Sequence, residues 1–221
     1  MEIFENIKGS KVVNAHMDNK LEKIRVSIGS AIVLGLIKGM IDAEPTTIYL
    51  LTYIEGKCSA NCAFCPQART SKARTDMLSR VVWPVFNIKD VVKSIKKAFE
   101  DGKIKRVCIQ ALNYPNVQND IVHIAAEIRS VSKIPISVSC QPLKCEDMIK
   151  LAEIGVDRIG IALDAATEEI FSRIKGEKSG GPYRWNNHFD ALKNAVKIFG
   201  RGNVTTHLIA GLGESEEDFV S

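Results

Sequence analysis

The chain has 221 residues, 45% hydrophobic and 25% charged, which is enough to bury one sizeable core. Thirty basic and 26 acidic side chains leave a formal charge of +4, too small and too dispersed to predict nucleic acid as a partner. The longest apolar stretch, residues 28–37, is far shorter than the roughly 20 residues of a membrane span. Because the first residues also lack the order of a secretory signal, we expect a cytoplasmic protein without membrane contact or disulfides.

Strands and helices are predicted to alternate strictly after residues 1–44, a segment in which we expect one or two helices. Runs of apolar and β-branched residues predict the strands, and apolar residues at helical spacing predict the helices. The predicted strands span residues 46–54, 104–111, 136–140, 156–163 and 204–210, and the predicted helices span residues 87–102, 117–131, 145–154, 168–174 and 185–199. This alternation implies right-handed βαβ units and a parallel α/β sheet whose two faces are both covered.

Five such units favour a (β/α) barrel of the TIM type over a doubly wound sheet, although periodicity alone does not separate the two. The barrel core is expected to span residues 45–221 and to stop after its fifth strand. Since that strand would keep an open edge, we expect a fragment, or a chain that needs a partner subunit to complete the barrel.

Three cysteines, Cys58, Cys62 and Cys65, follow the first predicted strand within eight residues. A structural zinc site or a ferredoxin-type cluster would need a fourth ligand close by, and none is present at suitable spacing. An iron–sulfur cubane with only three cysteine ligands has one iron open to a substrate or cofactor, which is a catalytic arrangement. A zinc site completed by a distant residue is the alternative. The carboxyl end of a strand is also where parallel α/β folds place their active sites.

The motif C-x3-C-x2-C, with Phe64 before its last cysteine, resembles the signature of the radical S-adenosylmethionine (radical SAM) superfamily. The resemblance implies a [4Fe-4S] cluster on Cys58, Cys62 and Cys65, whose open iron binds S-adenosyl-L-methionine. It also implies that an electron from a reductant such as ferredoxin or flavodoxin cleaves this cofactor to methionine and a 5′-deoxyadenosyl radical. The backbone around Phe64 would contact the adenine.

From Cys58 to Ser221 the sequence resembles the biotin synthase branch of that superfamily. The resemblance implies that Asp164 lies near the cofactor ribose and that Ile209 packs on the adenine. Each of these residues also has an ordinary alternative role. Phe64 would then be a loop aromatic, Asp164 a strand-end cap and Ile209 a core residue. The segments that carry the resemblance are CPQ (65–67), RVCIQALNYPN (106–116), VSCQPL (138–143), RIGIALDAATEEIF (158–171) and HLIAGLGE (207–214).

Several positions depart from the biotin synthase pattern. Gly160 and Ala162 replace two asparagines that flank the ribose, and Thr205 replaces the third cysteine of the auxiliary cluster. The superfamily's Gly-Gly-Glu motif is Gln110-Ala111-Leu112 here. We therefore expect a substrate other than dethiobiotin, either a small molecule or a group on an acyl carrier, and favour the octanoyl chain of an archaeal-type lipoyl synthase.

The remaining cysteines, Cys108, Cys140 and Cys145, are candidates for an auxiliary iron–sulfur cluster that donates sulfur, with buried packing thiols as the alternative. His188 and His207 are assigned to packing. The function expected is that of a radical SAM sulfurtransferase, which abstracts hydrogen from an unactivated carbon and inserts sulfur there. An iron–sulfur electron carrier without enzymatic activity and a zinc-stabilised α/β binding module are the alternatives.

Overall fold

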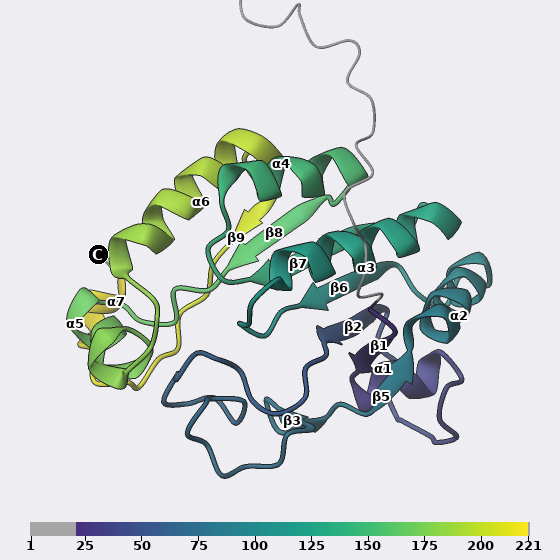
Figure 1. Ribbon diagram of the computed structural model, residues 1–221, viewed down its shortest axis with the longest axis horizontal. Helices are drawn as coiled ribbons and strands as arrows, with labels where there is room; N and C mark the ends of the chain where they lie inside the picture. The colour runs from purple at the N-terminus through teal and green to yellow at the C-terminus, as the bar shows by residue number, and fades with distance from the viewer. Residues whose placement is uncertain (1–20, 221) are drawn as a thin grey trace, which may run out of the picture.

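The computed structural model describes residues 21–220, which form one large sheet, a small hairpin and helices (Figure 1). The sheet has seven strands in the order β5-β1-β2-β6-β7-β8-β9. Its strands are β1 (Lys23–Val26), β2 (Thr47–Thr52), β5 (Val85–Asn87), β6 (Arg106–Gln110), β7 (Ile136–Cys140), β8 (Arg158–Ile161) and β9 (Val204–Thr205), and the hairpin is formed by β3 (Met77–Leu78) and β4 (Val81–Val82). The helices are α1 (Ile28–Val33), α2 (Ile88–Glu100), α3 (Val117–Val131), α4 (Cys145–Ile154), α5 (Glu168–Ile174), α6 (Trp185–Phe199) and α7 (Glu216–Val220), with a 3-10 turn η1 (Glu177–Ser179).

Strands β2, β6, β7, β8 and β9 are parallel and lie side by side in chain order. A doubly wound sheet would reverse its strand order near the middle, whereas a barrel adds each new strand beside the last one. The predicted partial barrel of alternating strands and helices is therefore confirmed, as an open sheet with β5 and β9 at its edges.

The two antiparallel strands β1 and β5 were not predicted. β1 lies in the segment expected to be helical and pairs with β2 on one side and β5 on the other. Residues 1–20 of that segment lie outside the described residues, so the division at residue 44 stays a prediction. β9 is also shorter than the predicted strand 204–210, and only Leu208 forms a further bridge, to Asp164.

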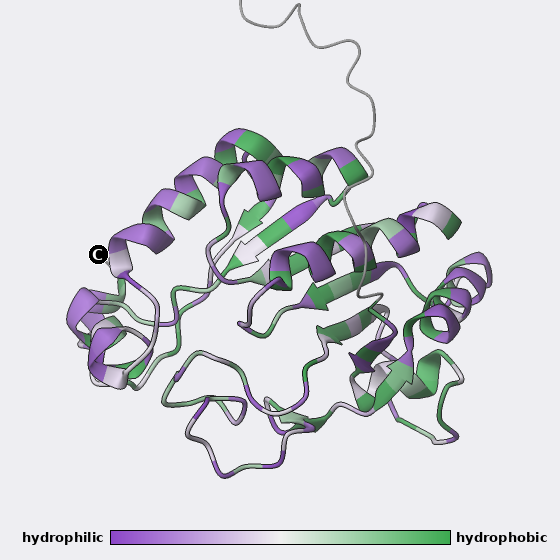
Figure 2. Cartoon of the chain, viewed as in Figure 1, coloured by the Kyte–Doolittle hydropathy of each residue, from purple (hydrophilic) through white to green (hydrophobic). Residues whose placement is uncertain are grey.

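The outer face of the sheet is aliphatic and is covered by helices α2, α3, α4 and α6 (Figure 1). Alternate strand residues point to this face and are almost fully buried: Val107, Ile109, Ile136, Val138, Ile159 and Ile161. They pack against apolar helix residues such as Ile121 and Leu151 in one continuous core. Figure 2 shows the same division, with hydrophobic residues on the strands and hydrophilic ones along the outward surfaces of the helices.

Local sequence explains the helix boundaries. The side chain of Asn87 accepts a hydrogen bond from the Lys89 amide and caps α2, whose buried residues Val91, Ile95 and Ala98 recur at helical spacing. Gly155 ends α4 at a φ of 94°, a conformation that glycine adopts without strain.

The inner face of the sheet carries polar and small side chains that are partly exposed. The strand register places Cys108 beside Ser137, and it aligns Gln110, Ser139, Gly160 and Thr205 in one row across four strands. A Cβ atom on Gly160 would lie 2.9 Å from Oγ1 of Thr205, so this row is closely packed. Within residues 21–220, no helix combines the length and apolar character needed to cross a membrane.

Candidate functional site

The cysteine loop begins just after β2, at the carboxyl ends of the parallel strands. Ser59 donates from its backbone N and from Oγ to the carbonyl of Asn113, at 2.8 and 2.7 Å. The backbone N of Ala63 donates to the carbonyl of Ile174 at 2.7 Å. These bonds fix the loop between the segment that follows β6 and the end of α5.

Two polar side chains brace the loop from within. Gln67 is only 1% exposed, and its Nε2 donates to the carbonyls of Thr75 and Met77 at 2.7 and 2.6 Å. Lys57 Nζ donates to the carbonyl of Pro66 at 2.7 Å and to that of Ala73. The loop therefore holds its shape through hydrogen bonds of the protein itself. In the sequence, Gln67 was noted only as part of the CPQ motif, and these hydrogen bonds were not predicted.

The three thiols lie close enough to influence one another's charge. Cys58 is buried, and its Sγ accepts a hydrogen bond from the Asn113 amide at 3.1 Å. Burial, together with smaller contributions from the charges of Cys65, Asp164 and Cys58, raises the pKa of Cys62 to about 12, although Lys175 acts in the opposite direction. Burial also raises the pKa of Cys65. Without a metal, the thiols of Cys62 and Cys65 would therefore be protonated at neutral pH, and a bound metal centre would displace these protons.

The donor set fits an iron–sulfur cluster. Three thiols from one braced loop, partly shielded from water and with a backbone N–H on one sulfur, are the kind of ligands that such clusters use. In the described part of the chain, no group of three Cys, His, Asp or Glu side chains converges as on a single metal ion. Cys58, Cys62 and Cys65 are the residues that would hold such a cluster.

A buried ion pair lies beside the cysteine loop. Lys175, 4% exposed, donates from Nζ to Oδ2 of Asp164 at 2.5 Å and to the carbonyl of Ala162 at 2.8 Å. Its ammonium group also lies 5.2 Å from the ring centre of Tyr183. This lysine follows α5 and was missed by sequence reasoning, because nothing in the KGEKSGGP segment marks one of its lysines as buried.

Asp164 is the centre of this polar group. Its backbone has a φ of 66°, in the left-handed region that few residues other than glycine adopt. Oδ1 of Asp164 lies 2.9 Å from Nε2 of His207. Burial alone would raise the pKa of Asp164, but the bond to His207 and the charge of Lys175 outweigh it and lower the pKa. The expectation that His207 only packs is therefore incomplete, since it contacts a candidate site residue.

Three aromatic rings enclose the other side of the site. His188 packs edge-on against Phe171 and Tyr183, with ring centres 4.9 and 5.4 Å apart. The predicted packing role of His188 agrees with these contacts and with its exposure of 1%. Burial lowers the pKa of His188 to about 4, so its ring is neutral. The Nδ1 atom lies 3.1 Å from the Arg184 carbonyl and must donate to it, which makes Nε2 an acceptor.

The residues expected at the adenine lie in different surroundings. Phe64 is 43% exposed and lines a groove of about 500 Å³ with Cys65, Pro66 and Arg80. Ile209 donates its backbone N–H to the carbonyl of Asp164 at 3.0 Å, so the chain brings these two expected residues together. The roles of Phe64, Asp164 and Ile209 toward a cofactor stay predictions.

The structure does not bring Cys108 and Cys140 together. Cys108 is on the inner face beside Ser137, whereas Cys140 lies three residues further along β7 and therefore points to the outer face. There it is 7% exposed within the aliphatic core, and burial raises its pKa to about 12. Cys145 is exposed at the start of α4. An auxiliary cluster on these cysteines stays a prediction, and their arrangement gives it no support.

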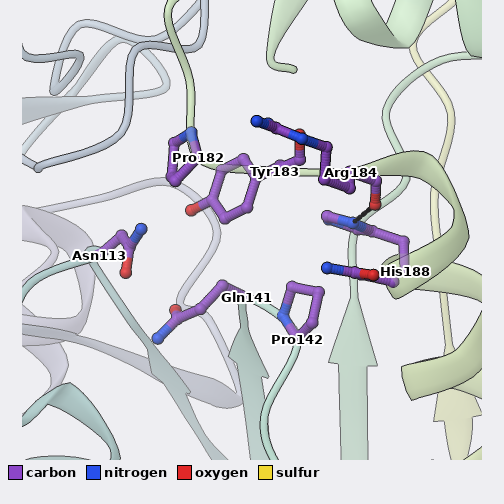
Figure 3. A pocket seen from close by; sticks show the side chains of 8 residues that line it. Asn113, Gln141, Pro142, Pro182, Tyr183, Arg184 and His188 are labelled. Atoms are coloured by element: carbon purple, nitrogen blue, oxygen red, sulfur yellow. Dashed lines mark hydrogen bonds between the residues drawn. The ribbon is translucent and has the colours of Figure 1, made fainter. Parts of the chain in front are cut away.

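A cavity of about 220 Å³ opens at the same end of the sheet (Figure 3). In Figure 3, Pro182 and Tyr183 face Gln141 and Pro142 across it, and Asn113 and His188 lie at its two ends. Arg184 and Asn187 complete the lining. Asn113 joins this cavity to the cysteine loop, because its backbone is bonded to Cys58 and Ser59.

The sequence is similar to those of two curated biotin synthases. The chain is 28% identical to the biotin synthase of Chlamydia pneumoniae over 189 residues, which are 83% of this chain and 52% of that protein. It is 27% identical to the biotin synthase of Magnetococcus marinus over 177 residues, 78% of this chain and 51% of that protein. The chain thus spans about half the length of these curated relatives.

Solved structures show the same fold at lower sequence identity. The hydrogenase maturase HydG has a TM-score of 0.59 and 16% identity, covering 86% of this chain and 39% of its own. Methylornithine synthase (PylB) has a TM-score of 0.57 and 14% identity, covering 86% and 51%. The model of the Radical SAM superfamily matches residues 53–221, from the start of the cysteine loop to the end of the sequence. The chain therefore belongs to the radical SAM superfamily, whose members use a [4Fe-4S] cluster and S-adenosyl-L-methionine.

Proposed function

We propose that this chain is the radical-generating part of an enzyme that cleaves S-adenosyl-L-methionine and abstracts hydrogen from an unactivated carbon. The observation that carries the proposal is the braced loop of Cys58, Cys62 and Cys65 at the carboxyl end of the sheet, beside a buried Lys175–Asp164 pair. When bound, the [4Fe-4S] cluster and the cofactor would supply the electron transfer and the 5′-deoxyadenosyl radical.

The protein's own groups would bind and orient the cofactor. The carboxylate of Asp164 is held by Lys175 and His207, and its remaining lone pairs can accept a hydrogen bond from a ribose hydroxyl. Ile209 and the backbone near Phe64 would contact the adenine. Lys175 places a positive charge near Cys62, which would lose its proton when a cluster binds, and this charge favours the thiolate.

Sulfur insertion is the finer hypothesis, favoured by the similarity to biotin synthases. It requires a sulfur donor, and the opposite directions of Cys108 and Cys140 mean that these two thiols do not form one donor site within the described residues. Hydrogen abstraction is therefore the proposed reaction. Sulfur transfer, including transfer to an octanoyl chain, is the second candidate.

A basic segment around the cysteine loop supports an acidic electron donor. Residues 57–80 contain five basic side chains and one acidic side chain: Lys57, Arg69, Lys72, Arg74, Arg80 and Asp76. Asp76 is paired with Arg74. An acidic ferredoxin or flavodoxin would be attracted to this surface, next to the groove that Phe64 lines.

The test is to replace each loop cysteine with serine and reconstitute the proteins anaerobically with iron and sulfide. We expect Cys58→Ser, Cys62→Ser and Cys65→Ser each to lose cluster binding and reductive cofactor cleavage, because each removes a ligand that has no substitute nearby. Cys145→Ser, at an exposed thiol, is the matched control and should behave as the original protein does.

Iron and sulfide content, visible absorbance and 5′-deoxyadenosine formation are the measurements. Full cleavage by any of the three loop variants would refute the proposal. A cluster that forms on the unaltered loop but never cleaves the cofactor would favour an electron carrier instead, and binding of a single zinc would favour a structural module.

A further inference from the structure

Lys175 is a buried positive charge next to the cysteine loop. Its side chain is 5% exposed, and the residue before it is tied to the loop, because the Ile174 carbonyl accepts the Ala63 amide at 2.7 Å. The ammonium group also lies 5.2 Å from the ring centre of Tyr183, and this ring packs against the apolar cluster that contains Cys58. Backbone and side-chain contacts thus both place this charge beside the cysteines.

The backbone around Lys175 is held in a tight turn. Helix α5 ends just before this residue, whose N–H donates to the Phe171 carbonyl at 3.0 Å. The chain then returns over it, since the N–H of Gly181 donates to the Gly176 carbonyl at 2.9 Å. A Cβ atom on Gly181 would clash with the carbonyl oxygen of Lys175, so only glycine fits there. The turn therefore fixes the point from which the lysine side chain extends.

The ion pair of Lys175 and Asp164 acts on the cysteines mainly through its positive member. Burial dominates the pKa of Cys62, and among the charged groups Lys175 has the largest effect on this pKa, larger than the opposing effect of Asp164. The second carboxylate oxygen of Asp164, Oδ1, lies 2.9 Å from Nε2 of His207. The net effect of the pair at Cys62 is therefore that of a positive charge.

A positive charge near an iron–sulfur cluster favours the reduced form, because reduction adds one negative charge. This attraction is strong where water does not screen it, and the two side chains of the pair are only 5% and 6% exposed. Arg69 and Lys72, which belong to the basic segment of the loop, are exposed and should have weaker effects. Lys175 is thus distinguished by its burial.

We propose that the buried charge of Lys175 raises the reduction potential of the cluster and thereby favours electron entry. The inference rests on the proposed function, since it takes Cys58, Cys62 and Cys65 to be the ligands of that cluster. It adds a control of electron transfer that acts through charge, so a variant that keeps the packing and loses the charge should reveal it.

The test is a redox titration of the anaerobically reconstituted protein without S-adenosyl-L-methionine, followed by electron paramagnetic resonance of the reduced cluster. We expect Lys175→Met to lower the ratio of reduced to oxidised cluster about tenfold at a given potential, which is a shift of about 59 mV for one electron. Lys175→Arg keeps the charge and should stay close to the original protein. Lys178→Met removes an exposed lysine three residues away and is the matched control, with no shift expected.

Asp164→Asn separates the effect of charge from that of packing. It should shift the potential upward, because it removes the negative member of the pair and keeps Lys175. The double variant, Lys175→Met with Asp164→Asn, should lie below the original protein and above Lys175→Met alone. Because it leaves no unpaired buried charge, the double variant keeps the test decisive if Lys175→Met folds poorly.

An unchanged or higher potential in Lys175→Met, a downward shift in Asp164→Asn, or an equal shift in Lys178→Met would overturn the inference. Formation of 5′-deoxyadenosine by the unaltered protein, measured in separate samples with the cofactor, reports on the proposed function. Cleavage with a potential that does not depend on Lys175 would refute only the role of this lysine. A lysine-dependent potential without cleavage would refute only the radical chemistry.

Discussion

The two faces of the parallel sheet differ in polarity and in exposure to solvent. On the outer face, Ile109 and Val138 are at most 1% exposed and belong to one aliphatic core with the helices. On the inner face, Cys108, Ser137 and Ser139 from the same strands are partly exposed and polar or small. One residue along a strand is thus enough to pass from the core to the side that faces the site.

The two faces therefore contribute differently to folding stability and to the proposed function. Burial of large aliphatic side chains provides the main favourable free energy of folding, and here it is concentrated on the outer face. The inner face and the carboxyl ends of the strands carry charges, amides and the thiols other than that of Cys140 instead. Substitutions on the two sides should therefore have different consequences, even at adjacent positions.

The largest difference is expected between two neighbours on β6. Ile109→Ala should lower the free energy of unfolding by about 4 kcal/mol, because it leaves a cavity at a fully buried position in a central strand. Cys108→Ala, its matched control on the inner face, should cost less than about 1 kcal/mol. Urea unfolding followed by circular dichroism measures both. Equal effects would show that the inner face is as well packed as the outer one.

A smaller but still large effect is expected at the buried ion pair. Lys175→Met should destabilise the protein by about 3 kcal/mol, because it leaves the Asp164 carboxylate buried with only His207 as a side-chain partner. Lys178→Met, in η1, is the control at an exposed lysine and should have little effect. The double variant with Asp164→Asn should recover part of the loss, and failure to recover any would mean that Lys175 acts by packing alone.

The smallest effect is a pH dependence from His207. The hydrogen bond to Asp164 raises the pKa of His207 in the folded protein. The bond therefore contributes fully to stability below the pKa of the unfolded state, about 6.5. That contribution is lost as pH rises through the raised pKa of the folded state. Because 63% of the side chain is exposed, the change should stay below about 1 kcal/mol. His207→Gln should remove the slope in urea unfolding between pH 6 and pH 8, and an unchanged slope would contradict this origin.

Periodicity predicted the elements that build the outer face. Helices α3, α4, α5 and α6 and strand β7 have the residue ranges that were expected, since each follows a clear apolar pattern. The cysteine loop was found from its spacing alone. The local sequence predicts an element well when all its apolar residues pack against a single surface.

The remaining elements and site residues depend on tertiary contacts, which could not be predicted from local sequence. β1 and β5 are short, β5 pairs only with β1, and β1 joins both to β2, so their sequences carry little local signal. Lys175 becomes a site residue only because α5 folds back over Asp164. Whether Cys108 and Cys140 can share an auxiliary cluster depends on the faces of their strands, and the strand register that fixes these faces cannot be read from the sequence.

The hydrogen bond from the Asn113 amide to Cys58 Sγ has a consequence for electrochemistry. Hydrogen bonds to cluster sulfurs are among the factors that set a reduction potential. The donor belongs to the backbone, so every residue except proline at position 113 can supply it. The potential would then depend on the turn after β6, and the side chain at this position would be free to differ without altering the redox balance of the site.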